Sequence, residues 1–562
     1  MAKRDMSGLC SLVVLIGVAT MTASAQSFQV QCPTSTITHP DGTNAGVNNT
    51  EPSYTGPTVF AAGPHGYLTP TSKINGAIKC QQISGGDGYA TMGDGTQTYL
   101  FSFGPLSGLT DIAKGLPGTQ SPNVFNQSFS GTLAPGDPAT TNGATSSPYF
   151  VGNLGAFNYN GAIGQVPDAD CMADSNCSAG IPASGIDGHV DPRQIMDVGV
   201  MNGNIPAPLM AIDEDDEFFL TLSNVGMIMR PDLFEQHTVH FHGYPNASAF
   251  YDGVPDASVA INIGGSFTYY YLAPDAGTYF WHCHITPPEH LQMGMVGQIY
   301  VRPRQNRVAV GSSLYDALVL QQGDLRTKCD SNDILCSNPL PAGGTAGSAS
   351  RASTGNYAYN DGDGSTHYDV EYPLQIHGFD PNFHFVGMTF NPEAFADMKD
   401  KYFLLNGRSY PDTVAPGPLA TQSSDGSMHY AQPLPAIINI PLGGRALLRI
   451  SDLDVSEYQT LASLGIPMQV IALNAKLLRD QAGNNLYYKS NSITLAGGES
   501  LDVILDAGDT DKYPAGSTFY LYTPDLDHLS NDAENFGGLM TEVHICGTVT
   551  GGNTFGNTCT NN

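Results

Sequence analysis

Two short stretches hold side chains that could bind a transition metal. Residues 237–243 read HTVHFHG, and residues 279–295 read YFWHCHITPPEHLQMGM. They contain six of the fifteen histidines, one cysteine and the only tryptophan. Two imidazoles, a thiolate and a weak axial thioether form a blue-copper ligand set, whereas zinc has no use for a methionine at a fixed offset. The ligand types therefore favour copper over zinc or packed core histidines. The residues that supply this set are His237, Cys283, His290 and Met295.

The spacing inside each stretch predicts a second metal-binding surface. Side chains of a strand alternate between its two faces. His240 and His242 therefore share one face, and so do His282 and His284, while Cys283 points away from its two neighbours. We expect the thiolate to bind one copper while the flanking imidazoles bind others. Electrons could then leave the thiolate-bound copper along two short covalent paths.

The combined pattern resembles the copper signature of multicopper oxidases of the laccase-like, two-domain type. HxxHxHG is followed by HCHI, a further histidine and a methionine five positions later. The resemblance implies type 1 copper on His237, Cys283, His290 and Met295, type 2 copper on His240, and a type 3 pair on His242, His282 and His284. His290 follows Cys283 by seven positions, where the family usually has five, so residues 286–289 are expected to reshape the loop. Residues 293–299 also resemble copper nitrite reductases.

The number of histidines bears on the reaction. Type 2 and type 3 copper together require eight histidines in the family, and this chain offers four at matching positions. The resemblance therefore implies an oxidase whose trinuclear cluster is completed at an interface, by a second copy of the chain or by a partner chain. Such an enzyme would oxidise a phenol or a metal ion such as Cu(I), Fe(II) or Mn(II) by one electron. It would reduce dioxygen to water.

Two alternatives remain open. A nitrite-reductase-like enzyme would hold a mononuclear type 2 copper on His242 and His282, with a third histidine such as His528 from a neighbouring subunit. His240, however, stands where those enzymes carry an aspartate. In the other alternative only the blue copper is filled, and the protein carries electrons or binds copper. Four further histidines would be costly to bury without partners, which argues against that reading.

Length, composition and an internal repeat predict the fold class. A chain of 562 residues is too long for one core, and 64 glycines and 38 prolines suit an all-β protein. Residues 406–411 echo 202–206, residues 497–503 echo 264–270, and residues 515–520 echo 276–280. The repeat predicts two copies of one β-sandwich, and the resemblance implies that these are cupredoxin-like Greek-key domains. The second copy lacks the ligands, with residues 462–468 and 523–525 in place of HxH and HCH. Its scattered histidines are expected to be structural or to lie on the surface.

The predicted domain layout has six parts. These are a signal peptide at 1–25, an irregular Gly/Ser/Pro-rich arm at 26–80, a copper-binding cupredoxin domain at 81–305 with a long insertion at about 105–191, a connector at 306–365, a second cupredoxin-like domain at 366–550, and a tail at 551–562. The first strand is expected within residues 91–104. The acidic run at residues 213–217 is interpreted as the solvated start of a strand rather than a cation site.

The N-terminus and the cysteines predict export. Lys3 and Arg4 precede an apolar stretch at residues 9–19 and a small-residue cleavage site at 23–25, which is typical of a secretory signal. Of the ten cysteines, Cys10 leaves with the signal and Cys283 is needed as a free thiolate. Eight could form four disulfides in an oxidising periplasmic or extracellular compartment. Proximity in the sequence suggests the pairs Cys171–Cys177, Cys329–Cys336 and Cys546–Cys559, which leaves Cys32–Cys80, although sequence leaves other pairings open.

The net charge of −30 argues against nucleic acid or an anionic membrane as a partner. No apolar stretch is long enough to predict a membrane span.

Overall fold

The computed structural model describes residues 32–40, 51–63, 66, 68–106, 112, 114–118, 120–122, 124–125, 203–227, 235–243, 249–263, 265–273, 275–323, 338–388, 394–422, 428–551 and 557–560. The predicted signal peptide, most of the predicted insertion, and the proposed pairs Cys171–Cys177 and Cys329–Cys336 lie outside these ranges. Within them, no helix is long and apolar enough to cross a membrane.

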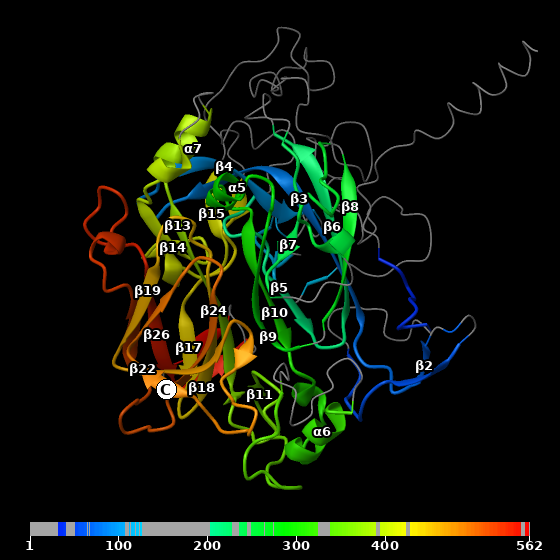
Figure 1. Ribbon diagram of the computed structural model, residues 1–562. Helices are drawn as coiled ribbons and strands as arrows, with labels where there is room; N and C mark the ends of the chain where they lie inside the picture. Colours follow the sequence, from blue (N-terminus) through cyan, green and yellow to red (C-terminus); the bar gives the residue numbers. More distant parts are fainter. Residues whose placement is uncertain are drawn as a thin grey trace, which may run out of the picture.

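The first β-sandwich consists of two four-stranded sheets (Figure 1). One sheet has the order β4 (Gln97–Pro105), β3 (Ile78–Thr91), β6 (Glu217–Gly226), β8 (Ser266–Leu272). The other has the order β5 (Met210–Asp213), β10 (Val296–Arg302), β9 (Gly277–His282), β7 (His240–Phe241). Inward-facing aromatic and aliphatic side chains from both sheets form one core, which includes Phe103, Phe241, Trp281 and Cys283.

The second β-sandwich repeats this arrangement with larger sheets. One has the order β14 (Tyr402–Leu405), β13 (Val370–Phe379), β18 (Arg445–Asp452), β24 (Ser500–Asp506), β20 (Met468–Leu473), β21 (Lys476–Leu477), with β22 (Tyr488–Ser490) also paired to β20. The other has the order β17 (Ile438–Pro441), β26 (Met540–Cys546), β25 (Thr518–Tyr522), β19 (Gln459–Leu464), β23 (Ser492–Leu495). A separate apolar core fills this sandwich.

The two sandwiches share strand direction as well as order. β3 runs parallel to β6, which pairs antiparallel with β8, and β13, β18 and β24 repeat that pattern. β10 runs parallel to β5 and antiparallel to β9, as β26 does to β17 and β25. The prediction of an all-β protein with two cupredoxin-like sandwiches is confirmed.

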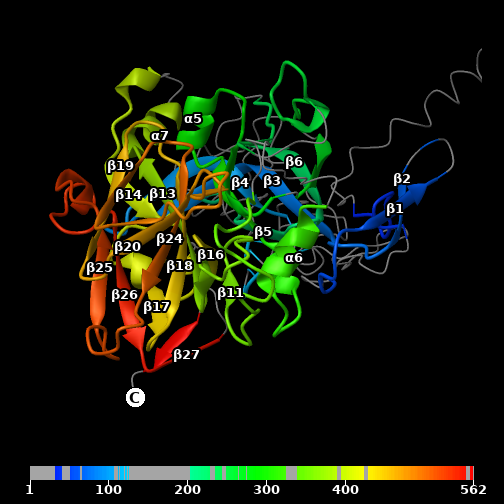
Figure 2. The same cartoon turned by 60° about the horizontal axis from the view of Figure 1, so that its bottom comes forward.

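The remaining strand pairs, helices and 3-10 turns are short and lie outside the two sandwiches (Figure 2). The paired strands are β1 (Val59–Ala62) with β2 (Leu68–Ser72), β11 (Asn356–Tyr357) with β12 (His367–Tyr368), β15 (Leu419–Gln422) with β16 (Met428–Ala431), and β27 (Thr548–Thr550) with β28 (Thr558–Thr560). The described α-helices are α5 (Pro287–Gln292), α6 (Leu314–Gln321) and α7 (Pro381–Met388). The 3-10 turns are η4 (Ala249–Tyr251), η5 (Arg304–Arg307), η6 (Phe395–Asp397), η7 (Asp412–Val414) and η8 (Asp527–Leu529).

The start of the first sandwich differs from the prediction. The expected first strand at residues 91–104 covers the end of β3, a turn and most of β4, and the long strand β3 before it was missed. β3 reads IKCQQISGGDGYAT and shows no alternation of polar and apolar residues, yet almost all of it is buried because it lies between β4 and β6. The predicted disulfides Cys32–Cys80 and Cys546–Cys559 are both present. The first joins the N-terminal arm to β3.

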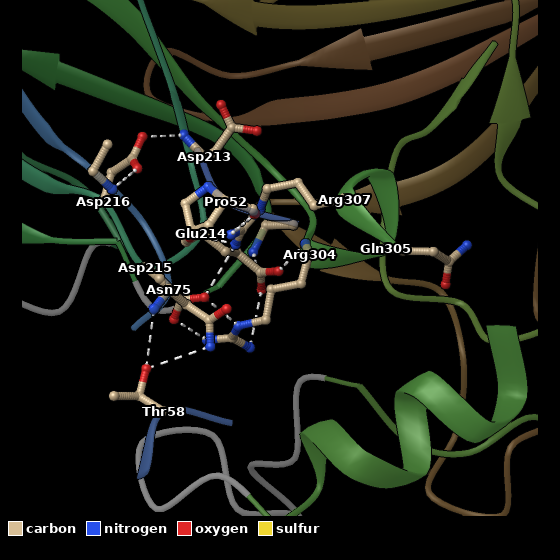
Figure 3. Close-up of polar contacts among 12 residues, drawn as sticks. Pro52, Thr58, Asn75, Asp213, Glu214, Asp215, Asp216, Arg304, Gln305 and Arg307 are labelled. Carbon is tan, nitrogen blue, oxygen red and sulfur yellow. Dashed lines mark hydrogen bonds and ion pairs between the residues drawn. The ribbon is translucent and has the colours of Figure 1, made fainter. Parts of the chain in front are cut away.

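The acidic run between β5 and β6 is buried, so its interpretation as a solvated segment is wrong (Figure 3). The Arg304 guanidinium donates to both Asp215 carboxylate oxygens at 2.7 and 2.8 Å, and Arg307 donates to Asp215 at 3.1 Å. The Arg304 backbone N–H donates to Glu214 at 2.6 Å. Buried carboxylates need such partners, and these arginines lie some ninety residues further along the chain. The acidic run therefore ties the β5–β6 turn to η5.

Glu51, Asp213 and Asp216 approach one another closely enough to hold a cation in that region. The Lys79 ammonium already pairs with Glu51 there, so a side chain supplies the positive charge.

Candidate metal centre

The pairing of β7 with β9 places the two histidine stretches side by side. His240 lies opposite His282, and Phe241 lies opposite Trp281. Phe241 and Trp281 stack with ring centroids 6.0 Å apart inside the first core. Because strand side chains alternate, the histidines beside them face the other side of the sheet.

On the core side of the strands, the structure brings together His237, Cys283 and His290. One ligand atom from each of these buried residues lies within 4.8 Å of the other two. His290 Nδ1 lies 3.3 Å from Cys283 Sγ, and the His237 and His290 rings are 5.3 Å apart. Cys283 is a free thiol. Residues 286–289, expected to reshape the loop, form the N-cap and the first residues of α5, and α5 carries His290 into the site.

His237, Cys283 and His290 have donor atoms that are available to bind a metal. Neither ring nitrogen of His237 has a hydrogen-bond partner, nor does His290 Nε2, although these atoms are buried. Burial lowers the pKa of His237 to about 3 and that of His290 well below its usual value, so both imidazoles keep free lone pairs at neutral pH. Burial raises the pKa of the Cys283 thiol to about 11, so forming the thiolate requires a cation. This donor set fits a soft transition metal.

Met295 lies next to this group. The Cys283 N–H donates to the Met295 carbonyl at 3.0 Å, and both side chains are buried in the first core. Gly294, between His290 and Met295, has φ +113°, and a Cβ there would lie 2.8 Å from Ser102 Oγ. The turn that returns the chain from α5 to β10 therefore requires glycine.

On the opposite side, four histidines form a second group. Ligand nitrogens of His240, His242 and His282 lie within 4.8 Å of one another. The His284 ring is 5.1 Å from that of His240 and 5.6 Å from that of His282. His242 is exposed and His240 and His284 are partly exposed, whereas His282 is buried. The predicted separation of Cys283 from its neighbours agrees with this geometry.

Backbone carbonyls orient two of these rings. His240 Nδ1 lies 2.7 Å from Asp252 O, and His282 Nδ1 lies 2.6 Å from Cys283 O. A donating Nδ1–H leaves Nε2 with a free lone pair, the tautomer that metal-bound histidines commonly adopt. His282 Nε2 lies 2.9 Å from His242 Nε2, so a proton or a cation must separate their lone pairs. Partial desolvation, followed by repulsion from His240 and His284, lowers the pKa of His242 to about 4.

Four residues that contact the proposed metal ligands were not identified from the sequence. Thr238 N–H points to Cys283 Sγ at 3.5 Å, and Asp252 orients His240. Glu235 Oε2 lies 3.8 Å from His290 Nε2. A Cβ on Gly85 would lie 2.6 Å from His237 Cδ2. Thr238 lies inside the first motif and could have been inferred, whereas Gly85 belongs to the strand that the sequence failed to reveal.

Comparison with known proteins agrees with this chemistry. Residues 187–306 match the family model described as multicopper oxidase. That segment is a multicopper oxidase domain. Over 118 residues the chain is 32% identical to laccase abr2 of Aspergillus fumigatus, covering 21% of this chain and 19% of the laccase. Over 109 residues it is 35% identical to the copper-containing nitrite reductase of Rhizobium meliloti, covering 18% of this chain and 26% of that protein.

The match therefore spans about a quarter or less of these relatives' own length. The solved multicopper oxidase mgLAC aligns with 84% of this chain and 88% of its own, at 14% identity and a TM-score of 0.43. For the matched domain, the family implies copper as the metal.

The register shows how the second sandwich differs from the multicopper oxidase domain. β19 pairs with β25 as β7 pairs with β9, and Ala462 lies opposite Tyr522 where His240 lies opposite His282. Leu464 therefore corresponds to His242. The HCH counterpart is residues 522–524, one position earlier than predicted.

The described histidines of the second sandwich are engaged elsewhere. His528 stacks on Phe403 at 3.7 Å, with Nδ1 3.1 Å from Gln459 Oε1. His377 and His384 are fully buried and lie close to backbone carbonyls. Beside the four-histidine group of His240, His242, His282 and His284, the second sandwich places Gly498, where a Cβ would lie 3.7 Å from His242 Nδ1.

Proposed function

We propose that this protein is an exported copper oxidoreductase that removes single electrons from a reducing donor and passes them to dioxygen. His237, Cys283, His290 and Met295 would hold type 1 copper, and His240, His242, His282 and His284 would hold type 2 and type 3 copper. Copper would supply one-electron oxidation of the donor at the first set and reduction of dioxygen to water at the second. The back-to-back arrangement of a buried Cys/His set and a four-histidine set about the antiparallel pair of strands β7 and β9 carries this proposal.

The chain's own residues would perform distinct tasks. The aromatic and aliphatic core around Cys283 excludes water from the first set. The peptide chain links Cys283 directly to His282 and His284, so the two sets share a covalent path. Asp252 and Cys283 carbonyls fix the tautomers of His240 and His282. Glu235, beside His290 Nε2, places a carboxylate where a phenol or a metal-ion donor would approach.

The second set would be completed at an interface with a second copy or a partner chain. Exposure of His242 and partial exposure of His240 and His284 support this. The described histidines of the second sandwich are not directed there. Export is supported by the N-terminal signal pattern and by the Cys32–Cys80 and Cys546–Cys559 disulfides.

The test is copper content per chain, with visible and EPR spectra, on protein of known oligomeric mass. We expect an oligomer with more than one copper per chain, both type 1 and type 2 signals, and oxygen consumption with a phenol or a metal-ion donor. His242→Ala should keep the blue colour and lose oxygen consumption. A monomer that reduces dioxygen would contradict the interface, and one copper per chain without turnover would identify an electron carrier.

A nitrite-reductase-like reaction is the second candidate. It is favoured by the close trio of His240, His242 and His282 and by the similarity to nitrite reductase. His528 would have to leave its stacking and hydrogen bonds to serve a neighbouring subunit. Nitrite turnover by the purified protein would decide in favour of this candidate.

A further inference from the structure

α5 has little ability to hold its own conformation. It has six residues, too few for an isolated helix to be stable in water. Its N-cap, Thr286, has φ 38° and ψ 60° and makes no side-chain capping bond. A residue with a side chain is strained in that left-handed conformation. Contacts outside the helix must therefore keep α5 in place.

Two buried histidines of the second sandwich contact the last carbonyls of α5. His377 Nε2 lies 3.0 Å from Leu291 O, and His384 Nε2 lies 3.1 Å from Gln292 O. The other ring nitrogen of His384 lies 2.8 Å from Tyr99 O on β4. His384 thus lies between two elements of the first sandwich, and its neutral ring can donate its one N–H to either carbonyl.

The helix that carries His384, α7, packs against β4 of the first sandwich. α7 lies beside α5 at the same end of the molecule (Figures 1 and 2). Phe383, next to His384, belongs to the first core rather than to the second. The His384 ring stacks on Phe379 at 4.0 Å, which fixes its plane. This packing gives the His384 nitrogens a defined direction.

Further contacts support the same helix. Gln292 Nε2 donates to Asp400 Oδ1 at 2.8 Å, and Leu291 packs against Leu453 of the second sandwich. Within the loop, the N–H of Met295 donates to His290 O at 2.8 Å. Tilting α5 would therefore move His290 and Met295 together.

From these contacts we propose that His377 and His384 are positioning residues for the first copper set. They hold α5 so that His290 Nδ1 faces Cys283 Sγ. The second sandwich, which has lost the ligand motifs, would thus fix the geometry of a site in its neighbour. The copper consequence rests on the proposed function, whereas the immobilisation of α5 does not.

The first test needs no copper. His384→Phe keeps a ring to stack on Phe379 and removes both polar contacts to carbonyls. His367→Phe is the control, because His367 Nε2 also contacts a carbonyl, Thr354 O at 3.1 Å, but lies on β12 away from α5. In apo protein, we expect hydrogen exchange of amides in residues 286–295 to be about tenfold faster in His384→Phe and unchanged in His367→Phe. Unchanged exchange in folded His384→Phe would overturn the proposal.

The second test uses copper-loaded protein. Loss of residues that orient metal ligands typically weakens metal affinity about 10–100-fold. His384→Phe should release type 1 copper to a chelator at least about tenfold faster and alter its EPR hyperfine splitting, with partial recovery in His384→Gln. A wild-type splitting and release rate would contradict the proposed role. If wild-type protein shows no type 1 signal while exchange still responds to His384→Phe, the proposed function fails and the immobilisation of α5 stands.

A milder variant covers the case in which His384→Phe does not fold. Asp400→Ala removes the hydrogen bonds that Asp400 accepts from Gln292 Nε2 and Ser456 Oγ and leaves His377 and His384 in place. It should accelerate exchange in residues 286–295 about two- to threefold. Wild-type exchange in Asp400→Ala would then reject the proposal.

Discussion

Replacing Gly85 with alanine should displace a proposed copper ligand without touching the copper. Gly85 lies in β3 beside the His237 ring, where an added Cβ would be 2.6 Å from Cδ2 and 3.2 Å from Cγ. The ring would have to move by about 0.8 Å to restore the 3.4 Å of an ordinary contact. His237 is fully buried and packed beside Phe103 and His290, so it has little room to move.

The magnitude can be estimated from packing and from metal geometry. Forcing an extra carbon into a well-packed core typically costs about 1–3 kcal/mol. Metal–ligand distances tolerate changes of only about 0.2 Å, so a shift several times larger should disrupt coordination by His237. We expect Gly85→Ala to lower the unfolding free energy by about 1–3 kcal/mol and to weaken or abolish the blue band.

The assay is urea unfolding combined with visible and EPR spectra of copper-loaded protein. Gly323→Ala is the matched control, because its added Cβ would lie 3.3 Å from Leu320 O after α6, outside the metal centre. Copper bound by the four-histidine group should be retained in both variants. A wild-type blue band and unfolding midpoint in Gly85→Ala would refute the reasoning.

Cys283→Ser should lose the blue colour under copper loading, because the thiolate produces it, and a retained band in the visible spectrum would contradict the ligand assignment. Burial and the neighbouring Asp454 raise the pKa of the Asp400 carboxyl to about 8. The folded protein therefore binds the Asp400 proton more tightly than the unfolded chain does, and the protein loses stability as pH rises from about 4 to about 8. Asp400→Asn should flatten that loss of stability in thermal melts. Glu235→Gln should lower kcat/KM about three- to tenfold for metal-cation donors but little for neutral phenols, because Glu235 lies beside His290. An equal effect on both donor classes would rule out electrostatic attraction.

Much of the metal centre could be predicted because its signals are local. Ligand types and period-two spacing are read within a few residues, and the pairing of β7 with β9 then places His240 beside His282. The repeat was also visible, since corresponding turns reuse similar residues. The start of α5 carried a signal as well, because proline is common in the first turn of a helix.

The features that were missed depend on partners far away in the chain. Asp215 is polar and follows a short strand, so nothing nearby indicates burial. Its partners Arg304 and Arg307 come about ninety residues later. Gly85 likewise looks like a turn residue, and its close approach to His237 emerges only when β3 is placed in the sheet.

A sandwich without copper ligands can still support a copper site in its neighbour. A coordinating residue is defined by its side chain, and Ala462 and Leu464 cannot replace His240 and His242. A supporting residue acts through packing and hydrogen bonds, and His384 provides these from α7, which is not part of the repeated strand order. On this proposal, the second sandwich supports the first copper set through His384 although it carries no copper ligands at the matching positions Ala462 and Leu464. Amide exchange in α5 should respond to substitution of His384 but not to substitution of Ala462. That contrast would distinguish a residue that supports the copper loop from one that only belongs to the repeated strand order.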